Sequence, residues 1–121
     1  MEVLLDSSFI VSCFRRKIDF ISALEEQGFK ILIPREVLQE LKDLKLKSVH
    51  DDRVAIGLAL EMFEKSKVKK VRLGGGSVDK QLIKKGRDGI YVATLDSAIK
   101  KMVPNRVVIS SSLNGILVER S

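Results

Sequence analysis

Two aspartates follow short apolar runs at points where a side chain could meet a ligand. Asp6 comes directly after Val3–Leu5, and Asp96 comes shortly after Ile90–Ala93. Apolar runs of this length, rich in β-branched residues and bounded by turn signals, are typical of buried strands. In a parallel α/β sheet, ligands bind in the crevice beyond the carboxyl ends of the strands. Asp6 and Asp96 are therefore predicted to face such a crevice.

Glu40 and Asp79 are predicted to approach the same crevice from helices. A helix is expected from Arg35 to Lys47, and at 100° per residue Glu40 falls about 40° outside its apolar stripe. Glu40 is thus the acid of this helix expected against the core, whereas Glu36 is expected to face water. Asp79 lies in the first turn of a helix that leads into the Asp96 strand. Side chains from four separate segments could therefore converge.

Each of the four acids alone has an ordinary structural explanation, as a helix cap, a first-turn charge or a residue at the rim of the core. Gathered in one crevice, however, carboxylates would raise one another's pKa unless a divalent cation neutralised them. Oxygen ligands suit Mg²⁺ or Mn²⁺. The single cysteine, Cys13, and the single histidine, His50, are too few for a zinc site. A magnesium or manganese site is the expected chemistry.

Strand-like and helical segments alternate along the chain, which predicts an α/β fold. We expect a three-layer α/β/α sandwich around a mainly parallel sheet of four or five strands, in a single domain spanning residues 1–121. Strands are predicted at 3–5, 31–33, 90–93 and 107–109, with a last short one at 116–118, and helices at 19–26, 35–47, 51–65 and after Asp6, Ser77 and Asp96. The segment 65–72 is expected to form an edge strand or a loop into one. Its lysines would either protect the edge or contact RNA.

Composition narrows the class of protein. Hydrophobic residues make up 45% of the 121 residues, which indicates a globular fold. No apolar run approaches the ~20 residues that span a bilayer, and the acidic N-terminus does not resemble a signal peptide. One cysteine excludes an internal disulfide and suits a reducing compartment. We expect a cytoplasmic protein without membrane contact.

The charge balance favours a polyanionic partner. Lys and Arg number 22 against 16 acids, giving a net charge of +6 and a pI near 9.6. With one Tyr and no Trp, base stacking is sparse, so RNA contacts would run through phosphates. The alternative is a lysine-rich protein whose charges only face water. The candidates for phosphate contact are Arg15, Arg16, Lys84, Lys85, Arg87, Lys100 and Lys101.

Four motifs in order, VLLDSS, IPREVLQEL, SVDKQLI and IYVATLDSAIKK, resemble the PIN-domain family of metal-dependent ribonucleases over essentially the whole chain. In that family, acids close a strand, lie in a helix after a strand and a proline, open a helix, and follow a strand in a Thr-x-Asp turn. Carried over position by position, the resemblance implies that the catalytic and metal-binding residues are Asp6, Glu40, Asp79 and Asp96.

The resemblance also implies an activity, the hydrolysis of phosphodiester bonds in single-stranded RNA with Mg²⁺ or Mn²⁺. Ser8 and Thr94 match small polar residues that orient carboxylates or waters in the family. No protein nucleophile is visible, because neither the serines nor Cys13 has a neighbouring histidine base. The second and fourth motifs are most similar to the branch that processes ribosomal RNA and to its archaeal relatives.

Three alternatives stay open. Leu95 and Val78 stand where relatives often carry Asn and a second Asp, so the chain could instead be an RNA-binding ribosome-assembly factor that cleaves little. A VapC-like toxin restrained by an antitoxin partner is the second. A phosphatase with an aspartyl nucleophile is the third, although it would need D-x-D where this chain has Asp6-Ser7-Ser8. The resemblance also implies a homodimer.

Overall fold

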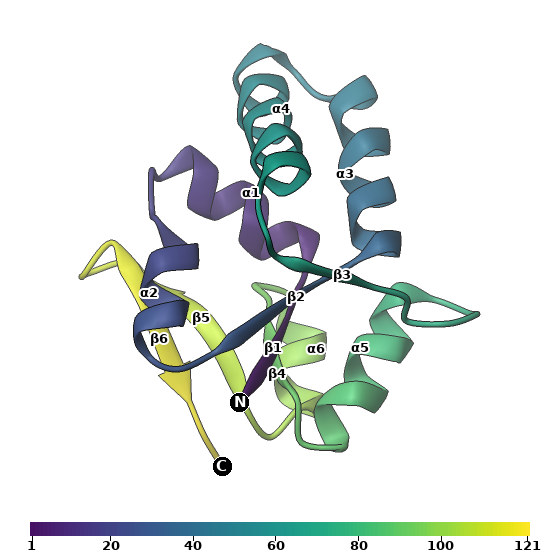
Figure 1. Ribbon diagram of the computed structural model, residues 1–121, viewed down its shortest axis with the longest axis vertical. Coiled ribbons are helices and arrows are strands. Elements are labelled where there is room, and N and C mark those ends of the chain that lie inside the picture. The colour runs from purple at the N-terminus through teal and green to yellow at the C-terminus, as the bar shows by residue number, and fades with distance from the viewer.

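Six helices and six strands alternate along residues 1–121, all of which the computed structural model describes (Figure 1). The strands are β1 (Glu2–Leu5), β2 (Lys30–Pro34), β3 (Lys69–Val71), β4 (Tyr91–Ala93), β5 (Arg106–Ser110) and β6 (Gly115–Glu119). The helices are α1 (Ser7–Arg15), α2 (Phe20–Glu26), α3 (Arg35–Lys47), α4 (His50–Lys65), α5 (Val78–Arg87) and α6 (Ser97–Met102). None of these helices is both long enough and apolar enough to cross a bilayer.

The strands form one sheet in the order β3-β2-β1-β4-β5-β6. All neighbouring pairs are parallel except β5 and β6, which form an antiparallel pair. The expected α/β class and mainly parallel sheet are confirmed, but the expectation of four or five strands is wrong, because segments at both edges pair. At one edge the charged segment forms β3, which places Lys69 and Lys70 on an edge strand.

Both faces of the sheet carry apolar side chains, because successive residues of a strand point to opposite faces. On β1, Val3 and Leu5 belong to the larger of two buried clusters, which also contains residues of α1, α2, α3 and α4. Leu4 belongs to the smaller cluster, together with residues of α5 and α6. At Gly86 a Cβ would lie 2.5 Å from Cγ1 of Val103, so α5 can reach this position only with glycine.

Four helices begin at one edge of the sheet. β1, β2 and β4 are parallel and lead into α1, α3 and α6, so these helices start at the carboxyl ends of the strands. α5 precedes β4 and therefore also starts at this edge, where Figure 1 shows the four helix starts near one another. Asp6, Ser77 and Asp96 cap α1, α5 and α6 with their side chains.

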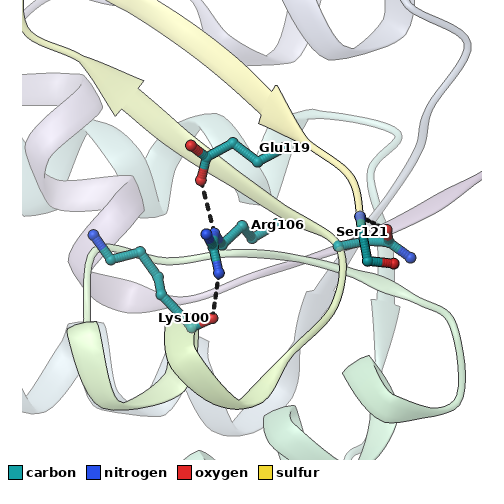
Figure 2. A network of polar contacts seen from close by, with 5 residues as sticks. Lys100, Arg106, Glu119 and Ser121 are labelled. Atoms are coloured by element: carbon teal, nitrogen blue, oxygen red, sulfur yellow. Dashed lines mark hydrogen bonds and ion pairs between the residues drawn. The ribbon is translucent and has the colours of Figure 1, made fainter.

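A polar network fixes the far end of α6 (Figure 2). Arg106 donates from Nε to Oε1 of Glu119 at 2.7 Å and from an Nη1 hydrogen to the backbone carbonyl of Lys100 at 2.6 Å. The backbone N–H of Ser121 donates to Oδ1 of Asn105 at 3.2 Å. β5, β6 and the last turn of α6 are thus joined, and α6 is held at both of its ends.

Candidate functional site

Asp6 lies at the carboxyl end of β1 and is only 5% exposed. Its backbone N–H donates to the carbonyl of Ala93, which continues the pairing of β1 with β4. Its Oδ1 accepts from the backbone N–H of Ser7 at 2.9 Å. Its Oδ2 accepts from the hydroxyls of Thr94 at 2.7 Å and of Ser8 at 3.3 Å. The Asp6 carboxylate is therefore fixed in place by three donors.

Burial raises the pKa of Asp6 above its ordinary value. The hydrogen bonds from Thr94 and Ser7 oppose this rise, whereas the negative charge of Asp79 adds to it. Asp6 is thus a carboxylate whose charge is costly in this position unless a cation compensates it.

Thr94 and Ser8 connect the end of β1 to the turn after β4. The hydroxyl of Thr94, which is fully buried, accepts from the backbone N–H of Asp96 at 3.1 Å while it donates to Asp6. The hydroxyl of Ser8 accepts from the backbone N–H of Leu95 at 3.1 Å while it donates to Asp6. Each hydroxyl both donates and accepts, so the two side chains fix the orientation of Asp6 and the path of the turn that carries Asp96.

Asp96 is joined to Asp6 through this turn. Its Oδ1 accepts from the backbone N–H groups of Ala98 at 2.8 Å and Ile99 at 3.3 Å, as expected of a helix cap. No hydrogen bond is made to its second oxygen, Oδ2, by any protein group. One oxygen of Asp96 therefore has a structural role and the other is free to take a ligand.

Glu40 approaches from α3 and is partly buried. Its Oε1 is buried and has no hydrogen-bond partner, and no other buried side-chain nitrogen or oxygen atom in the chain is in this state. Burial raises the pKa of Glu40, and the charges of Asp6 and Asp79 raise it further. The nearby Ser7 hydroxyl lowers it only in part and makes no hydrogen bond to Oε1.

Asp79, at the start of α5, is exposed. The charge of Asp79 raises the pKa of both Asp6 and Glu40, and the charge of Asp6 also raises the pKa of Glu40. These three acids therefore share one electrostatic environment. Asp96 joins them through Thr94 and the backbone. In this conformation no three side chains of the types His, Cys, Asp and Glu are arranged closely enough to hold a metal ion.

Glu36 is partly exposed, and the expectation that it only faces water missed its contact with the loop after β3. Its Oε1 and Oε2 accept from the backbone N–H of Leu73 at 3.1 and 3.0 Å, and Oε2 also accepts from that of Gly74 at 3.2 Å. Burial pushes the pKa of Glu36 up, but these hydrogen bonds bring it below its ordinary value. Glu36 thereby anchors the loop that leads to Asp79. The backbone N–H groups of this loop need hydrogen-bond acceptors, but the sequence does not show that Glu36 supplies them.

The basic candidates are spread over several surfaces. Arg15 pairs with Asp52 at 3.3 Å, at the far end of α1 from Asp6, and Arg16 follows it there. Lys100 and Lys101 lie in the last turn of α6. The remaining three candidates, Lys84, Lys85 and Arg87, are on α5, as is Lys80, which our sequence reasoning did not include. Its helical spacing from Lys84 and Arg87 is a signal in the sequence that could have identified it.

An apolar hollow of about 580 Å³ lies between α1, α2 and α4, and none of the four acids lines it. Cys13 is at its wall, and burial raises the pKa of the Cys13 thiol to about 12. A thiol with this pKa stays protonated at neutral pH, so Cys13 does not offer a nucleophile.

A comparison with models of known protein families found no match, and a comparison with curated proteins found none either. Function is therefore inferred from the residues and their geometry.

Proposed function

We propose that this chain is a metal-dependent endoribonuclease with a three-layer PIN-like fold, which hydrolyses phosphodiester bonds of single-stranded RNA with Mg²⁺ or Mn²⁺. One observation carries the proposal. Oε1 of Glu40 is buried without a partner, beside a buried Asp6 and within the field of Asp79. A buried polar atom without a partner costs free energy, and a divalent cation is the ligand that would satisfy this group of acids.

The oxygen-only donor types suit a hard cation, and the side chains would have to draw closer together than in this conformation to hold one. Asp6 accepts three hydrogen bonds, which leaves about one of the four lone-pair sites of a carboxylate open. Glu40 has an unused oxygen in Oε1, and Asp96 has one in Oδ2. Mg²⁺ takes few protein carboxylates and completes its shell with water and substrate phosphate. The residues that would hold the ion are Asp6, Glu40, Asp79 and Asp96.

A bound ion supplies a nucleophilic water at neutral pH and neutralises charge on the phosphate. The chain's own part is positioning. Thr94 and Ser8 hold Asp6 in one orientation, and Thr94 also holds the turn that carries Asp96. The helices α1 and α5 direct their positive N-terminal ends toward this edge of the sheet, where they favour an anionic substrate. The resemblance to the ribosomal-RNA-processing branch supports ribosomal RNA as the substrate.

Cleavage of a labelled single-stranded RNA in Mn²⁺ tests the proposal, with Asp96→Asn as the variant. Asparagine keeps an oxygen for the N–H groups of Ala98 and Ile99, so the cap of α6 is retained while the charge is lost. We expect cleavage to fall by about 100-fold or more. Equal cleavage by both proteins would remove Asp96 from the site. RNA binding without any cleavage by the native chain would support the assembly factor instead.

A further inference from the structure

The outer face of α5 carries a basic groove. A hollow of about 370 Å³ is lined by Lys80, Ile83, Lys84, Arg87 and Asp88. The three cations are spaced four and three residues apart, which places them on one face of the helix. We call Lys80, Lys84 and Arg87 the α5 basic stripe.

No acid forms an ion pair with the α5 basic stripe, although Asp88 lines the same hollow. None of the three ion pairs in the molecule includes a residue of the stripe. The guanidinium of Arg87 instead contacts Sδ of Met102 at 3.9 Å, which places the end of α6 beside the groove. Three cations without a carboxylate within 4.0 Å form a surface that attracts a polyanion.

The charge of the molecule is distributed unevenly. Residues 77–103, which contain α5 and α6, hold six basic and three acidic residues, and two of those acids are Asp79 and Asp96. Residues 35–65, which contain α3 and α4, hold six basic and seven acidic residues. α5 and α6 thus carry an excess of positive charge that α3 and α4 lack, and residues 66–76, around β3, add four basic residues and no acid.

The stripe begins beside the acidic site and leads away from it. Lys80 follows Asp79 directly, and with a rise of 1.5 Å per residue Lys84 and Arg87 lie about 6 and 10 Å further along α5. The inner face of α5 is fixed by buried Leu82 and by the close packing of Gly86 on Val103. Because the helix cannot turn on its axis, the stripe is held facing outward.

We propose that the α5 basic stripe binds the phosphodiester backbone of single-stranded RNA next to the bond that is cleaved. This inference rests on the proposed function and adds that the RNA substrate lies along the α5 basic stripe. The groove contains no aromatic side chain, so it offers no stacking platform for bases. Contacts to phosphates give affinity and position without reading sequence. The stripe therefore holds RNA of any sequence beside the acids.

The same helix supplies an internal control in Lys85. This residue is partly buried on another flank of α5, where it lines a separate cavity of about 160 Å³ with Leu4, Leu32 and Arg72. Lys85 carries the same charge as Lys84 but faces away from the groove. Its removal is expected to leave RNA binding nearly unchanged.

The test is the salt dependence of binding of a fluorescent 12-nucleotide oligouridine in EDTA. The variant Lys80→Ala/Lys84→Ala/Arg87→Ala is compared with Lys42→Ala/Lys45→Ala/Lys47→Ala on α3, which loses the same charge from exposed positions. For single strands the slope of log K against log salt is about 0.7 per phosphate contact, so the first variant should lose about 2 from its slope. The second should lose little. Equal losses, or an unchanged slope in the first variant, would overturn the proposal.

Single substitutions give a second reading if the triple variant does not fold. Lys84→Ala should lower the slope by about 0.7, whereas Lys85→Ala should not change it. The nuclease proposal is tested separately by the Mn²⁺-induced rise in melting temperature without RNA. If that rise occurs and the stripe has no effect on binding, only the present inference fails. If binding depends on the stripe but Mn²⁺ neither stabilises the protein nor supports cleavage, the nuclease proposal fails, and of the present inference only the binding of RNA by the stripe stands.

Discussion

Two glutamates one turn apart on α3 lie in opposite situations. Both oxygens of Glu36 accept backbone N–H groups of the loop after β3, and the pKa of Glu36 lies below its ordinary value although burial pushes it up. Oε1 of Glu40 is buried without a partner, and burial together with the charge of Asp6 raises the pKa of Glu40. The same residue type on the same helix is satisfied by the protein in one case and left unsatisfied in the other.

The difference separates an acid whose charge the fold stabilises from one whose charge it leaves uncompensated. Two backbone N–H groups, of Leu73 and Gly74, stabilise the charge of Glu36, so its role is complete in the folded chain. Glu40 lies within the field of Asp6 and Asp79, and burial together with these charges makes its charged form unfavourable. Under the proposed function, the acid that binds the cation is the one whose charge the protein does not compensate.

Glu40→Gln should produce the largest effect. Without the Glu40 charge the cation loses a ligand, so cleavage should fall by about 100-fold and the Mn²⁺-induced rise in melting temperature should shrink. In EDTA the variant should melt about 3–5 °C higher than the native protein, the shift that ~1 kcal/mol produces in a chain of this size. Activity assays and thermal melts with and without Mn²⁺ measure these changes.

Asp43→Asn is the matched control on α3. Asp43 is exposed and accepts a hydrogen bond from Gln39 at 3.0 Å, which asparagine can also accept. Its loss of charge should change neither cleavage nor melting temperature measurably. If the two variants behaved alike, the special position of Glu40 would be refuted.

Glu36→Gln should destabilise the protein, whereas Glu40→Gln should stabilise it in EDTA, and the effect of Glu36→Gln should be smaller. An amide offers one acceptor oxygen and turns an NH₂ group toward the donors of Leu73 or Gly74. The free energy of unfolding should fall by about 1 kcal/mol, to a similar extent in EDTA and in Mn²⁺. Urea denaturation measures this change. An increase in stability in EDTA, as expected of Glu40→Gln, would erase the contrast between the two glutamates.

The smallest predicted effect is a difference in the pH dependence of stability between Glu40 and Glu36. Because the pKa of Glu40 is raised in the folded protein, Glu40 stabilises the fold at low pH, and this stabilisation is lost as pH rises. In EDTA the native protein should therefore lose stability relative to Glu40→Gln above about pH 4.5. The lowered pKa of Glu36 gives the reverse, a contribution present above pH 4.5 and lost as pH falls. Denaturation of all three proteins from pH 3.5 to 7 would show diverging trends, and parallel curves would contradict both assignments.

Local patterns were sufficient for the elements and for part of the site. Apolar runs marked the strands that end before Asp6 and Asp96, and the residues that cap α1, α5 and α6 followed from their positions. These features depend on residues close together in the sequence. The placement of Asp6 and Asp96 at one edge then followed from the parallel pairing of β1 and β4.

Long-range partners were beyond the reach of the same patterns. Glu36 meets Leu73 and Gly74 across 37 or more residues, and helical periodicity placed Glu36 in water because it says nothing of the loop that covers it. The edge strands β3 and β6 likewise form by pairing with β2 and β5, which the local sequence does not specify. Periodicity did not distinguish Glu40 as an acid with an unpaired oxygen, since that depends on the surrounding helices.

The central claim is that acids from four separate segments hold one divalent cation. Crystals soaked in Mn²⁺ and measured near the manganese absorption edge test it most directly. We expect an anomalous peak between the carboxylates of Asp6, Glu40 and Asp79, next to the turn of Asp96, and no peak in crystals of Glu40→Gln. A peak elsewhere, or none at saturating Mn²⁺, would contradict the claim.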